Sequence, residues 1–134
     1  MILYLDASAL VKRYVAEIGS DAVNEAIGRA EATGTSLISR AEVGAALAKT
    51  VRMGILTQEE AWEALRAFRR EWPDLVRVQI TEWVVARADD LAWEHGLRGY
   101  DAVHLAAALV CFNSPFGIRF VWTAGFQLTT APFR

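Results

Sequence analysis

The sequence predicts an α/β fold, a three-layer α/β/α sandwich with a central parallel sheet of four or five strands. Short apolar runs alternate along the chain with longer segments whose apolar residues recur at helical spacing. Parallel strands need crossover connections, usually helices, and these crossovers are almost always right-handed, which places helices on both faces of the sheet. The chain has 134 residues, 54% of them hydrophobic, enough for one well-buried core but not two, so we expect a single domain over residues 1–134.

The first strand is expected at residues 2–6, where four apolar or aromatic residues lead to the carboxylate of Asp6. Small residues follow at once and begin a helix that is expected over 7–16. A second helix is expected over 21–32, because its apolar residues share one helical face and Gly34 follows as a terminator. These two helices would form the first crossover.

A short second strand is expected at residues 36–39, the sequence SLIS, and a helix over 40–53 follows it. The next helix, expected over 58–72, has a clear start signal. Thr57 stands at its N-cap position with Glu60 three residues later, the pattern of a capping box in which each side chain binds the other residue's backbone N–H group.

The second half of the chain continues the alternation. Pro73 ends the preceding helix, and residues 75–80, LVRVQI, alternate as a strand. Two helices are then expected over 81–95 and 100–112, separated by the glycine-containing break GLRG. The sequence IRFVW at 118–122 predicts a further strand, and the tail after it carries no clear pattern.

The composition argues against several classes of protein. The longest apolar run, residues 105–112, is far shorter than the roughly 20 residues that cross a bilayer, and no signal-peptide pattern opens the chain. We therefore expect a soluble, cytoplasmic protein without membrane association. The single cysteine, Cys111, has no internal disulfide partner and lies in an apolar helical stretch, which favours a buried hydrophobic side chain over a reactive thiol.

The net charge of −2 gives no global positive field that would attract nucleic acid. Several basic residues nevertheless lie close in sequence to the acids discussed below. They would form either a local basic rim around an acidic centre or ordinary solvated helix faces. They are Lys12, Arg13, Arg40, Lys49, Arg52 and Arg98.

Three acidic residues fall where ligands bind in open parallel sheets, just beyond the carboxyl ends of strands. Asp6 ends the first expected strand. Glu42 lies in the first turn of the helix that follows the second expected strand, and Asp101 begins the helix that precedes the last expected strand. We expect their carboxylates to converge on one edge of the sheet. Structural interpretations stay open: Asp6 would cap a helix, and Asp101 would favour a helix macrodipole. Glu42 would form a capping box with Ser39.

A cluster of carboxylates would need a counter-charge, because neighbouring carboxylates raise one another's pKa. A hard divalent ion such as Mg²⁺ or Mn²⁺ supplies that charge and prefers oxygen ligands. Zinc spacing is absent, since His95 and His104 are nine residues apart and the chain has no CxxC pair. A glycine-rich phosphate loop is absent too. The sequence therefore indicates an acid and metal site without a nucleotide cradle.

Three segments carry a family resemblance: LDASALVKRY, SRAEVGAAL and LRGYDAVHLAAAL, in this order and spacing. Together they closely resemble the PIN-domain family and, within it, the VapC-type toxins of type II toxin–antitoxin pairs. The resemblance implies a Mg²⁺- or Mn²⁺-dependent endoribonuclease that acts on RNA. It also implies a homodimer that is held inactive by a small VapB-like antitoxin, whose C-terminal segment would fill the active groove.

The resemblance also assigns roles to individual residues. By motif match, Asp6, Glu42 and Asp101 would be the catalytic acids that hold the metal ion. Ser8 looks like the family's hydroxyl that supports the first acid or a metal-bound water, with a helix N-cap as the alternative. His104 shares a helix face with Asp101 and would either support catalysis or make a structural hydrogen bond.

Two further segments matter to the resemblance. Arg98, in the loop before the third acid, would meet RNA phosphate or an acidic neighbour. The family's last motif, T-x-D-x-x-L, stands here as TAGFQL, so that Thr123 and Leu128 are in register while Gly125 occupies the acidic position. The loss of that carboxylate would weaken metal binding and could reduce activity.

The leading hypothesis is therefore a toxin ribonuclease in which metal-activated water hydrolyses RNA and leaves a 5′-phosphate and a 3′-hydroxyl. The alternative is a degenerate PIN domain with weak or no cleavage that mainly binds antitoxin or RNA. A receiver-like phosphoacceptor domain is a third hypothesis. It would need an acidic pair near the first strand and a lysine near the last, and the sequence has neither.

Overall fold

The computed structural model describes residues 2–112, 118–123 and 126–127, and for Phe112 and the last two segments it describes the backbone alone. Within these residues the strands form one sheet in the order β3-β2-β1-β4-β5. The pairs among the first four are parallel, and β5 runs antiparallel to β4. The bounds are β1 (Ile2–Leu5), β2 (Ala32–Ser36), β3 (Val76–Val78), β4 (Ile118–Thr123) and β5 (Phe126–Gln127).

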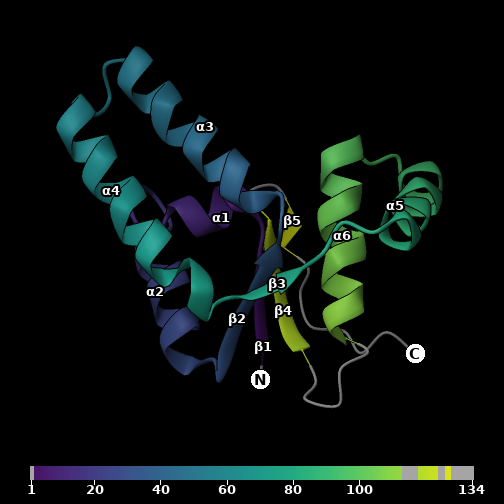
Figure 1. The fold of residues 1–134 in the computed structure, drawn as a ribbon. Helices are drawn as coiled ribbons and strands as arrows, with labels where there is room; N and C mark the ends of the chain where they lie inside the picture. The colour runs from purple at the N-terminus through teal and green to yellow at the C-terminus, as the bar shows by residue number, and fades with distance from the viewer. Residues whose placement is uncertain (1, 113–117, 124–125, 128–134) are drawn as a thin grey trace.

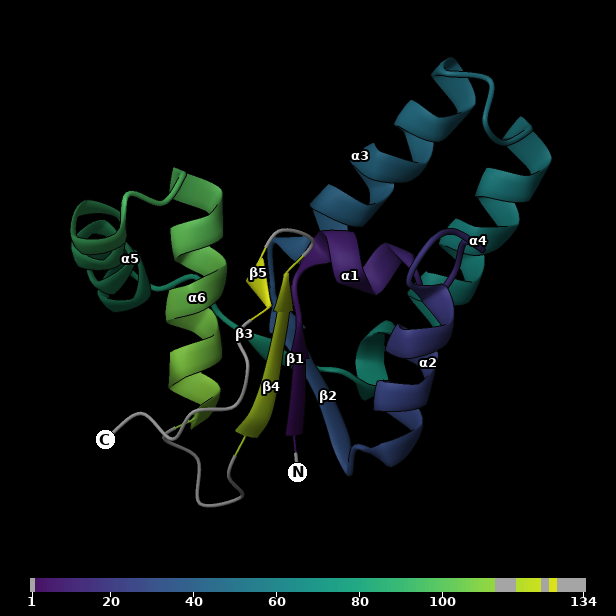
Figure 2. The same ribbon diagram turned by 180° about the vertical axis from the view of Figure 1, so that it is seen from behind.

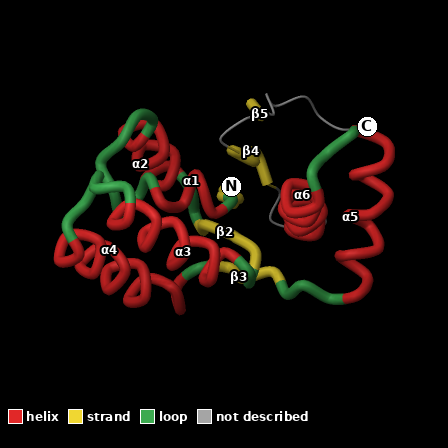
Figure 3. The backbone as a smooth tube through the Cα atoms, turned by 90° about the horizontal axis from the view of Figure 1, so that it is seen from above, coloured by secondary structure: helices red, strands yellow, loops and turns green. Residues whose placement is uncertain are grey.

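Helices cover both faces of the sheet, as Figures 1 and 2 show from opposite sides. One layer contains α1 (Ala7–Val11), α2 (Ser20–Arg29), α3 (Ser39–Arg52), α4 (Gln58–Glu71) and the short 3₁₀ helix η1 (Trp72–Asp74). The other contains α5 (Glu82–His95) and α6 (Gly99–Phe112). The view along the sheet in Figure 3 places the strands between these layers, so the predicted parallel sheet between two helical layers is confirmed.

The central strand β1 is buried on both faces. Leu3 and Leu5 pack into the core formed with α1, α3 and α4, whereas Ile2 and Tyr4 pack against α6. All four residues are buried, which explains why this strand is continuously apolar rather than alternating. Among the described residues, no helix is long and apolar enough to cross a membrane.

The second strand is the clearest error of the sequence prediction. The strand lies at Ala32–Ser36 rather than at 36–39, and the helix before it ends at Arg29. Burial of polar groups explains the error, because the strand sequence ATGTS has few apolar residues. The buried Thr35 hydroxyl donates to the carbonyl oxygen of Leu5 at 2.7 Å, so this polar strand is satisfied within the sheet.

Two smaller differences concern element ends. The first helix extends only over Ala7–Val11, and the chain continues in turns where the sequence predicted helix as far as residue 16. The third strand is three residues long, Val76–Val78, inside the predicted 75–80. The capping box at Thr57 and Glu60 is confirmed, with both of its hydrogen bonds present. The buried environment of Cys111 is confirmed as well, and burial raises the pKa of its thiol.

Candidate acidic site

Asp6 lies at the carboxyl end of β1, where the chain turns into α1. Its Oδ1 accepts a hydrogen bond from the backbone N–H of Ala9 at 2.9 Å and one from the Ser8 hydroxyl at 3.0 Å. Asp6 is therefore the N-cap of α1, and Ser8 supports the acid rather than capping the helix itself. The cap interpretation and the site interpretation of Asp6 are compatible, because the cap fixes the carboxylate at the sheet edge.

The pKa of Asp6 is raised, and burial is the main cause, since only 6% of the residue is exposed. The hydrogen bonds from Ala9 and Ser8 act in the opposite direction, as does the nearby His104. The negative charge of Glu42 raises the pKa further. Asp6 and Glu42 thus lie within electrostatic reach of each other.

Glu42 is not part of a capping box. The N-cap position of α3 is Ile38, and no side chain caps this helix. Ser39 is buried and hydrogen-bonds through its hydroxyl to the Thr35 hydroxyl at 2.7 Å, so it cannot act as the predicted cap. The Glu42 carboxylate instead binds His104, with 2.8 Å between Glu42 Oε1 and His104 Nε2. The structural interpretation of Glu42 as a cap is therefore wrong.

His104 connects the acidic edge to the protein core. It is 3% exposed, and its Nδ1 lies 2.8 Å from the hydroxyl of Tyr4 on β1. The predicted structural hydrogen bond of His104 is present, and it involves Glu42, one of the predicted acids. Sequence analysis did not single out Tyr4, which reads as one more apolar residue of the first strand.

Asp101 lies in the first turn of α6, three residues before His104. Its Oδ2 forms an ion pair with Arg98, at 3.0 Å from Nε, and the Arg98 guanidinium also lies over the ring of Tyr100. Of the two partners predicted for Arg98, the acidic neighbour is thus present. Arg98 itself is largely exposed, with 72% of its side chain accessible, whereas 23% of the Asp101 side chain is accessible.

The structure therefore brings Asp6, Glu42 and His104 into one electrostatic neighbourhood, whereas the Asp101 carboxylate is paired with Arg98. Across the part of the chain that the structure describes, no three His, Cys, Asp or Glu side chains are grouped closely enough to hold a metal ion. The predicted convergence of three acids on one ion is not present in this arrangement.

Two predicted positions lie near the C-terminus. Thr123 is the last residue of β4, and its neighbour Trp122 pairs with Leu5, so the backbone of Thr123 reaches the sheet edge at which Asp6 lies. Gly125, the position where the family motif has an acid, lies outside the described residues, as does Leu128.

The donor set present fits a hard divalent ion. Asp6 and Glu42 offer carboxylate oxygens, and one or two protein carboxylates together with substrate phosphate and water are the usual ligands of Mg²⁺. The one cysteine, Cys111 on α6, is buried in the core against the sheet and offers no exposed thiol ligand. The side chains of Asp6 and Glu42 therefore have the chemistry that a divalent metal ion requires.

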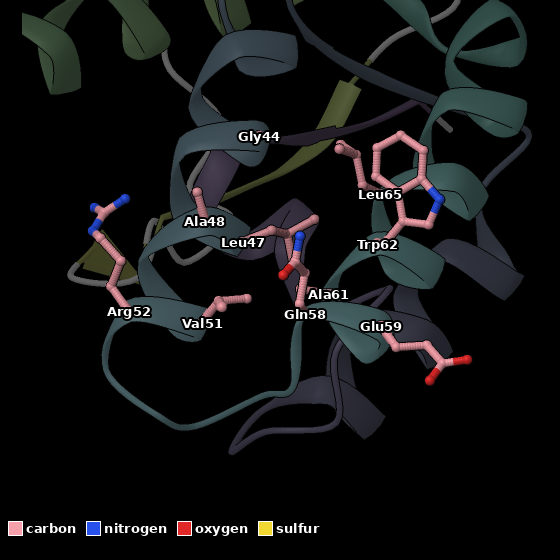
Figure 4. Close-up of a pocket in the computed structure, with 10 residues that line it drawn as sticks. All are labelled: Gly44, Leu47, Ala48, Val51, Arg52, Gln58, Glu59, Ala61, Trp62 and Leu65. Atoms are coloured by element: carbon pink, nitrogen blue, oxygen red, sulfur yellow. The ribbon is translucent and has the colours of Figure 1, made fainter.

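A second surface feature was missed by sequence analysis. A groove of about 950 Å³ lies between α3 and α4; it contains none of the predicted acids, and Arg52 is the one lining residue among the basic residues named above. Figure 4 shows Leu47, Trp62 and Leu65 among the side chains that line it, with Arg52 and Glu59 extending outward on either side. Its lining is largely apolar, and half of the Trp62 surface is exposed.

Comparison with known proteins agrees with the fold and the motifs. The model of the PIN domain family matches residues 3–110. This chain is a PIN-domain protein of the VapC family. Ribonuclease VapC45 and ribonuclease VapC49 of Mycobacterium tuberculosis are each 40% identical to it over 121 residues, which are 90% of this chain and 83% of the relative. Ribonuclease VapC3 of Pyrobaculum aerophilum is 33% identical over 108 residues, 81% of this chain and 82% of the relative.

Solved structures share the fold of this VapC protein. A toxin–antitoxin complex from Klebsiella pneumoniae superposes with a TM-score of 0.64 at 18% identity, covering 90% of this chain and 96% of the other. VapBC2 from Rickettsia felis, bound to a DNA fragment from its promoter, superposes with a TM-score of 0.59 at 15% identity, covering 92% of this chain and all of the other. At these identities the similarity concerns the fold alone.

Proposed function

We propose that this protein is an endoribonuclease and the toxin of a toxin–antitoxin pair, which hydrolyses RNA phosphodiester bonds with the help of Mg²⁺ or Mn²⁺. The observation that carries the proposal is the pair of carboxylates at the carboxyl edge of the sheet. Asp6 is fixed there by the start of α1, and Glu42 lies within its electrostatic reach. Relatives of 40% identity over 90% of the chain are named ribonucleases.

Each residue of the site has a defined part in this proposal. Asp6 and Glu42 would hold the metal ion, with Asp101 as a third acid. The bound ion would lower the pKa of a coordinated water and offset the charge that develops on the scissile phosphate. Ser8 holds the Asp6 carboxylate in one orientation through its hydroxyl. Hydrolysis would leave a 5′-phosphate and a 3′-hydroxyl.

Arg98 and Asp101 suggest how RNA would change the site. Their ion pair is largely solvent-exposed on the arginine side, so an RNA phosphate could compete for the guanidinium. Transfer of Arg98 to the phosphate would leave the Asp101 carboxylate available to the cation. Asp101 would then join the site only when substrate is present. This would explain why Asp101 is paired with Arg98 in the free protein.

A second candidate function is a degenerate PIN domain that binds antitoxin or RNA and cleaves weakly. Two observations favour it: glycine stands at position 125 where the family has an acid, and the described residues do not assemble three metal-binding side chains. We propose that the missing acid lowers the affinity for metal, and hence the activity, without removing either.

The proposed partners follow from the family. We propose a homodimer, a small antitoxin of the VapB type and an RNA substrate, with action in the cytoplasm. The structural neighbours include a VapBC assembly and another toxin–antitoxin complex, which supports the antitoxin. The antitoxin's C-terminal segment would reach the acids, where a basic side chain would meet the Asp6 and Glu42 carboxylates.

The test is to replace Asp6 with Asn and Glu42 with Gln and to measure cleavage of a mixed RNA pool. Cleavage should require Mg²⁺ or Mn²⁺, stop with EDTA and fall at least about 100-fold in either variant, because each removes a charged ligand. Asp90→Asn, the same type of change at an exposed position of α5, is the matched control and should retain full activity. Circular dichroism would verify that all variants fold.

Isothermal titration with Mn²⁺ separates the two candidate functions. Binding by the wild type at millimolar metal or below, lost in Asp6→Asn, supports the ribonuclease. A wild-type protein that neither binds Mn²⁺ nor cleaves RNA would instead support the degenerate domain. Undiminished cleavage in Asp6→Asn would refute the assignment of the site.

A further inference from the structure

A continuous chain of hydrogen bonds runs from the core to the acidic edge through Tyr4, His104 and Glu42. The Tyr4 hydroxyl lies 2.8 Å from His104 Nδ1, and His104 Nε2 lies 2.8 Å from Glu42 Oε1. The two rings meet edge to face at 66°, with their centroids 6.1 Å apart. The chain joins β1, α6 and α3, three elements that are distant in the sequence.

Burial along this chain is graded. Tyr4 is completely buried and His104 is 3% exposed, whereas 30% of the Glu42 side chain is accessible. Only the last member therefore reaches the surface where substrate and cation arrive. Tyr4 and His104 are therefore placed to orient the Glu42 carboxylate and not to contact the substrate themselves. Buried partners of this kind commonly orient metal-binding side chains.

The donors and acceptors of the three groups favour one arrangement of protons. An ionised carboxylate can only accept hydrogen bonds, so His104 Nε2 must carry the proton that is shared with Glu42. In a neutral imidazole, Nδ1 is then an acceptor, and the Tyr4 hydroxyl donates to it. The phenol keeps its proton, because burial, aided by nearby Cys111, Asp6 and Glu42, raises its pKa above the ordinary value. Every donor in the chain thus meets an acceptor.

We propose that Tyr4 is a positioning residue of the acidic site: it fixes the tautomer and orientation of His104, which in turn holds the Glu42 carboxylate beside Asp6. The role of Glu42 as a metal ligand rests on the proposed function, whereas the hydrogen-bond chain itself does not. Without the Tyr4 hydroxyl, Nδ1 would be buried without a donor, and the imidazole would no longer be held in one arrangement.

The experiment compares Tyr4→Phe with Tyr14→Phe. Tyr14 is the matched control, because its hydroxyl donates to Glu71 at 2.9 Å and its ring packs on Phe68, on the opposite side of the sheet from His104. Each variant removes one phenol hydroxyl: that of Tyr14 binds a carboxylate directly, and that of Tyr4 is connected to one through His104. Only Tyr4→Phe removes it from the chain that ends on Glu42.

The first readout is the ¹⁵N NMR spectrum of the histidine side chains, recorded without metal. The protein has two histidines, and His104 is recognised by its burial. In the wild type, Nδ1 of His104 should give the shift of an unprotonated nitrogen and Nε2 that of a protonated one. Tyr4→Phe should move both shifts toward averaged values and speed exchange of the Nε2 proton, while Tyr14→Phe should leave them unchanged.

The second readout is affinity for Mn²⁺ measured by titration. Groups that hydrogen-bond to a metal ligand typically contribute about 10- to 100-fold to metal affinity, so Tyr4→Phe, which acts through His104, should weaken binding by about 10-fold while Tyr14→Phe does not. His104→Gln and His104→Leu answer the same question if Tyr4→Phe does not fold. The amide of Gln can still donate to Glu42, so it should retain more affinity than Leu does.

These measurements distinguish a failure of the proposed role of Tyr4 from a failure of the proposed ribonuclease function. Wild-type shifts and Mn²⁺ affinity in Tyr4→Phe would overturn the positioning role and leave the ribonuclease proposal intact. A wild type that binds no Mn²⁺, combined with altered His104 shifts in Tyr4→Phe, would refute the metal site while the positioning of His104 stands. Equal affinity in the Gln and Leu variants would also contradict the role of His104 as a donor to Glu42.

Discussion

The helices on the two faces of the sheet contribute side chains of different size to the core. On the side of α1 to α4, the core contains Phe68 and Trp72, whose rings meet edge to face with centroids 5.4 Å apart. On the side of α6, the core contains Ala107 and Ala108, both completely buried. Large rings stabilise by the area they bury, whereas alanines allow a helix to approach the sheet closely.

This difference separates stability from chemistry. The close approach of α6 places His104 within hydrogen-bonding distance of both Tyr4 and Glu42. The aromatic side contributes most of the large buried rings, and it also carries α1, whose start fixes Asp6, and α3, which carries Glu42. We therefore expect substitutions on the two faces to have different signatures: large losses of stability on one, and loss of the His104 contacts on the other.

Phe68→Ala should have the largest effect on stability. Phe68 is fully buried between Tyr14 and Trp72, and removing such a ring typically costs about 3–5 kcal/mol of unfolding free energy. Urea denaturation followed by circular dichroism measures the loss. Glu63→Ala, on the exposed side of the same helix, should change stability by less than about 0.5 kcal/mol. A small effect of Phe68→Ala would show that this face does not dominate stability.

Ala107→Leu should have the next largest effect, of a different kind. Ala107 is fully buried in the core that also contains Tyr4, and overpacking of this sort costs about 1–3 kcal/mol. Because the added side chain would push α6 from the sheet, the NMR signals of His104 should change as well. Val110→Leu on the exposed side of α6 is the control. Unaltered His104 signals in Ala107→Leu would mean that α6 tolerates displacement without breaking the hydrogen-bond chain.

Much of the fold could be predicted because its signals are local. Helical periodicity, the capping box at Thr57 and the proline after α4 act within a few residues of the elements they define. The second strand could not be predicted, since its polar residues are stabilised by partners far away in the sequence. Thr35, for example, binds the carbonyl oxygen of Leu5 and the hydroxyl of Ser39. No local pattern distinguishes such a strand from a loop.

The site divides in the same way. Asp6 and Glu42 follow from the rule that ligands bind at the carboxyl ends of parallel strands, and the structure brings them within electrostatic reach. The sequence left two partners open for Arg98, RNA phosphate and an acidic neighbour. The pairing with Asp101 could be foreseen because the two residues are three positions apart. Tyr4 was missed because its hydroxyl finds a partner 100 residues away. Ser39 was misread as a cap because only the fold shows that it is buried.

Thr57→Ala should have a moderate effect that is independent of both faces. The Thr57 hydroxyl accepts from the backbone N–H of Glu60 at 3.1 Å, and the Glu60 carboxylate accepts from the backbone N–H of Thr57 at 3.1 Å. Loss of such a cap costs about 1 kcal/mol. Thermal unfolding should show the decrease, whereas Thr57→Ser should restore most of it. A variant as stable as the wild type would mean that α4 is stabilised by packing alone.

Trp93→Gln should have the smallest effect on an isolated chain. Trp72 is 4% exposed, as expected for a core residue, but Trp93 on α5 is 90% exposed and buries almost no area in this chain. A change at such a position alters stability by less than about 0.5 kcal/mol. The proposed homodimer makes the measurement informative, because a second copy that covered Trp93 would bury it. Denaturation of wild type and variant at two protein concentrations tests this. An equal, concentration-independent stability places Trp93 outside any dimer contact, whereas a loss that grows with concentration shows that a second chain packs on α5.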